Sequence, residues 1–137
     1  MMKTRRHFLA TLAASVLSLA AGGAMATQPT VEILAMPHPP VQMALKPLRD
    51  WLAAQGGKIK VSQVDIESPQ GTKLLTSVGL NGHIPILILI DGQYRHRRKD
   101  GKPLAFVNFP AIPEAPSGVR GEWTTADVEA VLMERMK

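Results

Sequence analysis

The sequence predicts an α/β domain with a central mixed sheet of four to five strands and three flanking helices. Short apolar or alternating runs, typical of strands, take turns with amphipathic segments of helical period. A helix separates the first two strand-like runs, so these strands are expected to be parallel. The later runs are joined by short turns such as Asp91-Gly92, which predict an antiparallel meander.

The elements of the N-terminal half follow a strand–helix–strand–helix order. Val31–Met36 is almost entirely apolar, as expected for a buried parallel strand. Val41–Gln55 carries an apolar stripe of helical spacing, and Lys58–Ile66 alternates as a second strand. Ser68 followed by proline predicts the start of a short helix over Pro69–Val78.

The C-terminal half begins with His83–Ile90, which is the most apolar run of residues 27–137. Its unbroken isoleucines and leucines predict a central strand covered on both faces. Gln93–Arg98 and Pro103–Phe109 are expected to be two further strands. Thr124 with Asp127 three residues later forms a capping-box pattern that predicts the last helix.

The N-terminus has the features of a cleavable signal peptide over residues 1–26. A basic start precedes the apolar run Phe8–Ala21, and Ala24–Ala26 fits a small-x-small cleavage site. We therefore expect a single mature domain over residues 27–137. In the alternative interpretation, the segment stays uncleaved as an N-terminal anchor.

The segment Thr4–Leu9, Thr-Arg-Arg-His-Phe-Leu, resembles the bacterial twin-arginine export motif S/T-R-R-x-F-L. Ala10 departs from the lysine that is often found next. Proteins on this route cross the membrane already folded, so the resemblance implies a periplasmic protein. It would meet a membrane only through the signal peptide. The general secretory route stays open, because paired arginines also occur in other basic signal peptides.

Net charge and cysteine content argue against a nucleic-acid-binding protein and against a domain stabilised by disulfides. Removing residues 1–26 takes away three of the sixteen lysines and arginines and no acid, so the net charge falls from +5 to +2. A charge this small gives no support to a nucleic-acid partner. The chain has no cysteine, so an exported domain must be stabilised by its core rather than by disulfides.

The order of elements over residues 30–136 resembles the thioredoxin fold. The segment His38–Val41, His-Pro-Pro-Val, stands where that family has Cys-x-Pro-Cys, with Pro40 matching the family proline. Val64–Pro69 looks like the family's second-strand exit into a proline-started helix. The run ending in Pro85 looks like the approach to the family's cis-proline, so the resemblance implies a cis peptide bond there.

The missing cysteines set this chain apart from redox-active members of the family. His38 and Val41 occupy the two cysteine positions. Thiol–disulfide exchange needs one thiolate to attack and another thiol to leave, so we exclude oxidoreductase activity. No Ser-His-Asp arrangement, phosphate loop or paired-carboxylate motif is evident, so we expect a protein that is not an enzyme.

The resemblance implies a shallow groove between the motif loop and the proline loop. In the family this groove holds an extended substrate segment, and such binding needs no cysteine. We therefore expect a module that binds a periplasmic protein or peptide and needs no cofactor. The residues expected to line the groove are His38, Pro39, Pro40, Val41, His83, Ile84 and Pro85.

An alternative is a copper-binding or copper-delivery protein. Imidazole and thioether groups are ligands that suit copper, and folding before export would suit a metalloprotein. The candidate ligands are His38, His83, Met36 and Met43.

A basic run, Tyr94–Lys99, lies on a predicted strand and turn. Alternation would place Arg95, Arg97 and Lys99 on one face. Such a face suits an anionic partner, for example a lipid headgroup or an acidic protein patch. It also suits a solvated sheet edge that charge protects from aggregation. We favour this second interpretation.

Overall fold

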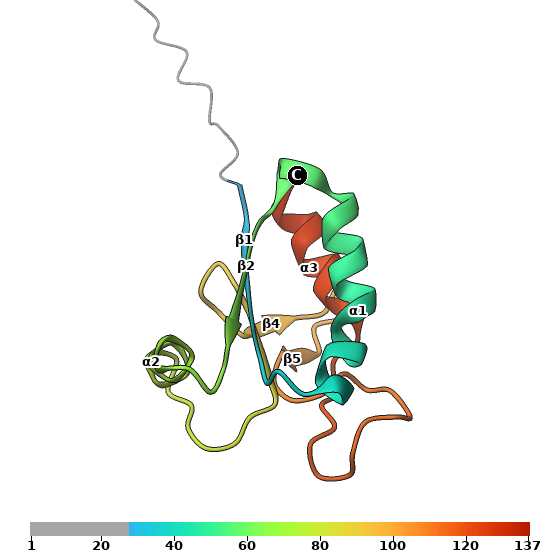
Figure 1. Ribbon diagram of the computed structural model, residues 1–137. Coiled ribbons are helices and arrows are strands. Elements are labelled where there is room, and N and C mark those ends of the chain that lie inside the picture. The colour runs from blue at the N-terminus through green and yellow to red at the C-terminus, as the bar shows by residue number, and fades with distance from the viewer. Residues whose placement is uncertain (1–27) are drawn as a thin grey trace, which may run out of the picture.

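The computed structural model describes residues 28–137, which form an α/β domain with three helices (Figure 1). Residues 1–27 lie outside the described residues, so the predicted signal peptide over residues 1–26 and its twin-arginine motif are not tested by the structure. The elements are β1 (Thr30–Ala35), α1 (Pro39–Ala54), β2 (Lys60–Asp65), α2 (Pro69–Ser77), β3 (Ile86–Ile90), β4 (Arg95–Arg97), β5 (Pro103–Ala105) and α3 (Thr125–Arg135), with a short 3-10 turn at Gly56–Lys58.

The main sheet has three strands in the order β2-β1-β3. β1 pairs in parallel with β2, as the intervening helix predicts, and antiparallel with β3. β4 and β5 form a separate two-stranded sheet, so the expected single sheet of four to five strands is not what the chain forms. The tight turn at Asp91-Gly92, where both residues have positive φ, is followed by only one bridge, Ile90 to Gln93, before the chain leaves the sheet.

β3 is the most buried strand, although it is not the central one. β1 lies in the middle, so the expectation that His83–Ile90 forms the central strand is wrong. Every residue of β3 is nevertheless buried. The reason is that its outer edge is covered by main chain: the Ile88 amide donates to the Phe106 carbonyl at 3.0 Å, and the Asn108 amide donates to the Ile86 carbonyl at 2.8 Å.

The helices cover the two faces of the main sheet unequally (Figure 1). α1 and α3 lie against one face, and α2 lies alone on the other. The α1/α3 face holds the larger core cluster, in which the edge of Trp123 meets Phe106 at 5.9 Å between ring centroids. The α2 face holds a cluster of five buried residues: Leu34, Ile66, Leu75, Leu87 and Leu89.

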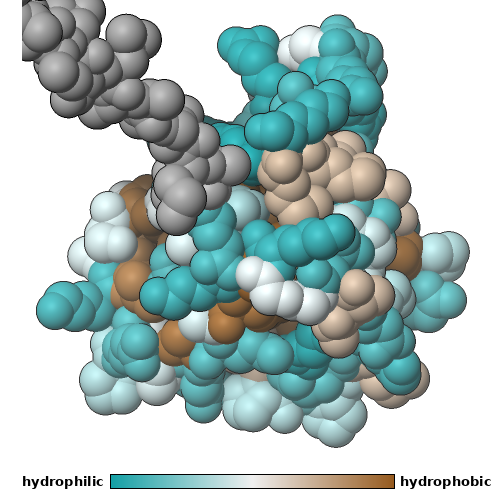
Figure 2. All heavy atoms as spheres, turned by 90° about the horizontal axis from the view of Figure 1, so that it is seen from above, coloured by the Kyte–Doolittle hydropathy of each residue, from teal (hydrophilic) through white to brown (hydrophobic). Residues whose placement is uncertain are grey.

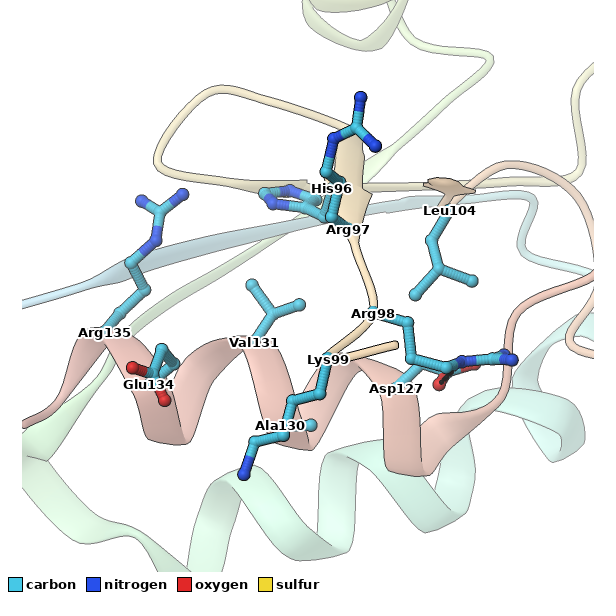
Figure 3. A pocket seen from close by; sticks show the side chains of 10 residues that line it. All are labelled: His96, Arg97, Arg98, Lys99, Leu104, Asp127, Ala130, Val131, Glu134 and Arg135. Carbon is cyan, nitrogen blue, oxygen red and sulfur yellow. Dashed lines mark hydrogen bonds and ion pairs between the residues drawn. The ribbon is translucent and has the colours of Figure 1, made fainter. Parts of the chain in front are cut away.

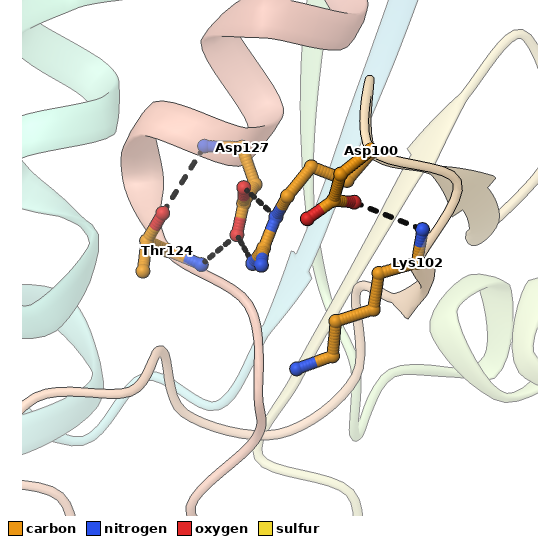
Figure 4. Close-up of polar contacts among 5 residues, drawn as sticks. Asp100, Lys102, Thr124 and Asp127 are labelled. Carbon is orange, nitrogen blue, oxygen red and sulfur yellow. Dashed lines mark hydrogen bonds and ion pairs between the residues drawn. The ribbon is translucent and has the colours of Figure 1, made fainter.

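The helix starts follow the sequence signals. Pro39 and Pro40 occupy the first turn of α1, where a missing N–H costs nothing. Ser68 caps α2 by accepting from the Gly71 amide at 3.0 Å. Thr124 and Asp127 form the expected capping box at α3 (Figure 4).

The face seen in Figure 2 is mostly hydrophilic, and its hydrophobic atoms appear in small areas between polar ones rather than as one continuous patch. Within residues 28–137, no helix combines the length and the apolar character that a membrane span requires.

Candidate functional site

The two segments that the sequence singles out do meet, at the end of the main sheet where β1 finishes and β3 begins. The Met36 amide donates to the Pro85 carbonyl at 3.0 Å, which ties the loop before α1 to the loop before β3. No peptide bond in the described residues is cis, so the expectation of a cis bond before Pro85 is wrong. A trans bond is the default for proline in the absence of a context that favours the cis isomer.

A pocket of about 390 Å³ opens beside this junction. Met36, Ile66, Leu75 and Ile84 supply apolar walls, since each packs in or against the small core cluster of the α2 face. The rest of the lining is polar apart from Gly82: Glu67 lies in the loop before α2, and Thr72 and Thr76 come from exposed positions of α2. The complete lining is Met36, Ile66, Glu67, Thr72, Leu75, Thr76, Asn81, Gly82, His83 and Ile84.

The main chain along one rim of this pocket is open. Asn81, Gly82 and His83 are exposed and Ile84 is half-buried. Across residues 28–137, no hydrogen bond joins the backbone of Asn81–Ile84 to the rest of the protein. The segment bends at Gly82, where φ is 87°, and the exposed amides and carbonyls on either side of this bend can pair with a second chain.

The groove residues proposed from the sequence divide into two groups. His38, Pro39, Pro40 and His83 are exposed, and Ile84 is half-buried. Val41 is only 3% exposed and belongs to the large core cluster, and Pro85 is buried as well. Val41 therefore fills the core and presents no surface to a ligand.

The candidate copper ligands are only partly brought together. Met36 and His83 line the same pocket, and His38 Nε2 lies 3.9 Å from the Glu67 carboxylate of that pocket. Met43 projects from α1 with 75% of its side chain exposed and does not line the pocket. In the described part of the chain, no group of three or more His, Cys, Asp and Glu is placed to hold a metal ion.

A chain of hydrogen bonds holds the loop before α1 in place. Arg49 Nη1 donates to Gln42 Oε1 at 2.7 Å, and Gln42 Nε2 donates to the Met36 carbonyl at 2.9 Å. Burial lowers the pKa of Arg49, which remains charged in any ordinary buffer. Gln42 and Arg49 are seven residues apart on one face of α1, a spacing that could have indicated their pairing from the sequence.

A second cavity, of about 450 Å³, lies between the β4–β5 hairpin and α3 (Figure 3). Leu104, Ala130 and Val131 form its apolar part, and the basic run supplies His96 to Lys99. Arg95, Arg97 and Lys99 are exposed while His96 and Arg98 are half-buried, as the alternation predicts. Burial lowers the pKa of His96 and so favours the neutral ring, against the opposing effect of a 2.8 Å hydrogen bond to the Gln93 carbonyl.

Within the described residues, Arg98 is the member of the basic run that forms an ion pair. Its Nε and Nη2 donate to the two carboxylate oxygens of Asp127, each at 3.0 Å. Asp127 also accepts from the Thr124 amide, so one carboxylate joins the hairpin to the capped start of α3 (Figure 4). The sequence showed the capping box but gave no signal for this long-range pair.

Comparison of the chain with protein-family models, with curated proteins and with solved structures finds no match.

Proposed function

We propose that this protein is an exported, thioredoxin-like module that binds an extended segment of a periplasmic protein or peptide, without redox chemistry. Three features support the thioredoxin-like arrangement. They are the parallel β1–α1–β2 unit, the antiparallel β3 and the helices on both faces of the sheet. The binding site is the pocket beside Met36, Glu67, His83 and Ile84.

The observation that carries the proposal is the open main chain of Asn81–Ile84 beside a pocket with apolar walls and a polar rim. An extended peptide gains main-chain hydrogen bonds by pairing with such a segment. Alternate side chains of the peptide then point in opposite directions, so one of them can enter the pocket. Ile66, Leu75 and Ile84 would contact an apolar side chain there, while Glu67 and His83 at the rim favour polar neighbours.

Two substitutions on α2 test the position of the site. Thr76 is exposed and lines the pocket, whereas the next residue, Ser77, is exposed and does not. The full chain would be titrated with fluorescent seven-residue peptides that have one central Leu, Phe or Lys. Thr76→Trp is expected to abolish binding by filling the pocket, and Ser77→Trp is expected to bind as the wild type does. Equal affinities in the two variants would contradict the proposed site.

Copper binding is a second candidate. It is supported by Met36 and His83, which line one pocket, and by His38, whose Nε2 lies 3.9 Å from the carboxylate of Glu67 in the same lining. Titration of the full chain with Cu(I) and Cu(II) against chelators of known affinity would test it. Tight one-to-one binding that is lost in both His38→Ala and His83→Ala would establish the metal site. Binding that survives either substitution would refute it.

Export is tested separately from binding. Replacing Arg5 and Arg6 with lysine keeps the positive charge of the N-terminus but removes the twin-arginine motif. We expect the variant to stay in the cytoplasm of a bacterial host in which the unmodified protein reaches the periplasm. Unchanged export would favour the general secretory route.

A further inference from the structure

The cavity between the β4–β5 hairpin and α3 lies apart from the proposed peptide site and has a different chemistry. Its volume of about 450 Å³ is within the range of small-molecule sites. Leu104 from β5 and Val131 from α3 face the cavity from opposite sides (Figure 3), and Ala130 leaves space beside them because its side chain is short. A ligand that fills this space needs an apolar body.

The cavity lining contains more cationic than anionic side chains. Both acids already have a cation: Asp127 binds Arg98, and Glu134 binds Lys137 at 2.9 Å. Arg135 is likewise held by Asp91 at 2.6 Å. Arg97 and Lys99 are the cations of the lining with no ion-pair contact within residues 28–137. Lys99 still lies near enough to Glu134 that its charge, after the hydrogen bond from Lys137, lowers the pKa of that carboxyl.

Lys99 and Arg97 differ in direction. The Arg97 guanidinium points away from α3 and donates to the Gly101 carbonyl at 3.2 Å, so it stays with its own hairpin. The Lys99 side chain passes Ala130 and crosses α3, and its nitrogen ends on the side of the helix away from Leu104 in this view (Figure 3). Within the described residues, Lys99 is therefore the lining cation beside α3 that has no ion-pair contact. One lysine complements one negative charge, which suits a carboxylate better than a phosphate dianion.

We propose that this cavity binds a small carboxylate with an aliphatic body, whose chain covers Leu104, Ala130 and Val131 and whose carboxylate pairs with Lys99. Binding here is independent of the peptide site, because the two linings share no residue. The Lys99 ammonium pairs with the carboxylate of the ligand. The aliphatic chain contributes most of the contact area, and its removal from water against the apolar lining favours binding.

Octanoate is a suitable probe, and octanamide is its uncharged counterpart of nearly the same shape. Both would be titrated into the full chain while the methyl NMR signals of Leu104 and Val131 are followed, so that association with the apolar segment Phe8–Ala21 is not mistaken for cavity binding. We expect octanoate to shift these signals at concentrations roughly tenfold lower than octanamide, because only octanoate forms a charge-assisted hydrogen bond.

Two lysine variants provide the matched test. Lys99→Gln is expected to weaken octanoate binding roughly tenfold and to leave octanamide unchanged. Lys102→Gln, on the same turn but outside the cavity lining, is expected to leave both unchanged. Ala130→Leu should abolish the shifts from both probes by filling the cavity. Equal shifts from the two probes, no shift at Leu104 and Val131, or equal effects of the two lysine variants would overturn the proposal.

Discussion

The two faces of the β2-β1-β3 sheet differ in how completely they are covered. On one face, α1 and α3 enclose the large core cluster, which includes the rings of Phe106 and Trp123. On the other, the nine-residue helix α2 covers a cluster of five buried residues and leaves the pocket beside Met36 and His83 open. We infer that the α1/α3 face supplies most of the stability of this domain, whereas the α2 face leaves part of its apolar surface open.

Trp123→Ala tests the stability side of this comparison and should have the largest effect. Trp123 is 1% exposed, and its Nε1 donates to the Val107 carbonyl at 3.1 Å. Removing the ring is expected to lower the free energy of unfolding by about 3–5 kcal/mol, measured by chemical denaturation. Leu75→Ala on the α2 face, which is already beside an open pocket, should cost about 2 kcal/mol. A larger loss from Leu75→Ala would reverse the comparison.

Gly71→Ala tests how closely α2 sits on the sheet. A Cβ atom at Gly71 would lie 2.6 Å from the Ile66 Cα and in direct conflict with the Asp65 carbonyl. The helix would have to move outward, so we expect a loss of about 1–3 kcal/mol in unfolding free energy and an altered pocket. The exposed neighbour Gln70 provides the control, since Gln70→Ala should change stability by less than about 0.5 kcal/mol. Similar stability of the two variants would show that α2 is loosely held.

The ionisation of Asp127 is expected to make the stability of the protein depend on pH. Burial raises the pKa of its carboxyl, but hydrogen bonds from Arg98 and Thr124 outweigh this effect and hold the pKa below the ordinary 3.8. As the pH falls, the Asp127 carboxylate is therefore protonated at a higher pH in the unfolded chain than in the folded protein. The carboxylate contributes stability above pH 3.8 that is lost as the pH falls through its folded pKa.

Asp127→Asn is accordingly expected to cost about 1–2 kcal/mol at pH 7. Its disadvantage relative to the unmodified protein should shrink as the pH falls from about 5 to below the folded pKa. Denaturation curves of both proteins across this range would measure the change. A constant difference at all pH values would mean that the charge of Asp127 does not contribute.

Met43→Ala should have the smallest effect. The Met43 side chain is 75% exposed on the outer side of α1, so its truncation is expected to change the free energy of unfolding by less than about 0.5 kcal/mol. Met36 packs against both core clusters, and Met36→Ala should cost about 1–3 kcal/mol. Comparable losses in thermal or chemical denaturation would contradict the placement of the two methionines.

Local signals in the sequence predicted the elements well. The caps at Ser68 and Thr124, the prolines before α1 and the parallel β1–β2 pair depend on neighbouring residues and on chain connectivity. Sheet order was less predictable, because an apolar run such as β3 looks the same whether another strand or a loop covers its edge. Here the loop through Phe106 and Asn108 covers it.

The candidate site was predictable only in outline. The sequence indicated the loops around His38 and His83, and these lie at the same end of the sheet, joined by the Met36–Pro85 hydrogen bond. Val41 begins the apolar stripe of α1, so its burial could be predicted, whereas the sequence gave no sign that Thr72 and Thr76 of α2 would complete the pocket wall. Such contacts depend on where α2 rests on the sheet, which a single sequence does not specify.

Amide hydrogen exchange along Gly82–Ile84 tests the central claim, that this main chain is open and pairs with an extended peptide. We expect fast exchange at these amides in the protein alone, protection once a binding peptide is present, and no protection in Thr76→Trp under the same conditions. Slow exchange before any peptide is added, or peptide binding that leaves these amides unprotected, would contradict it.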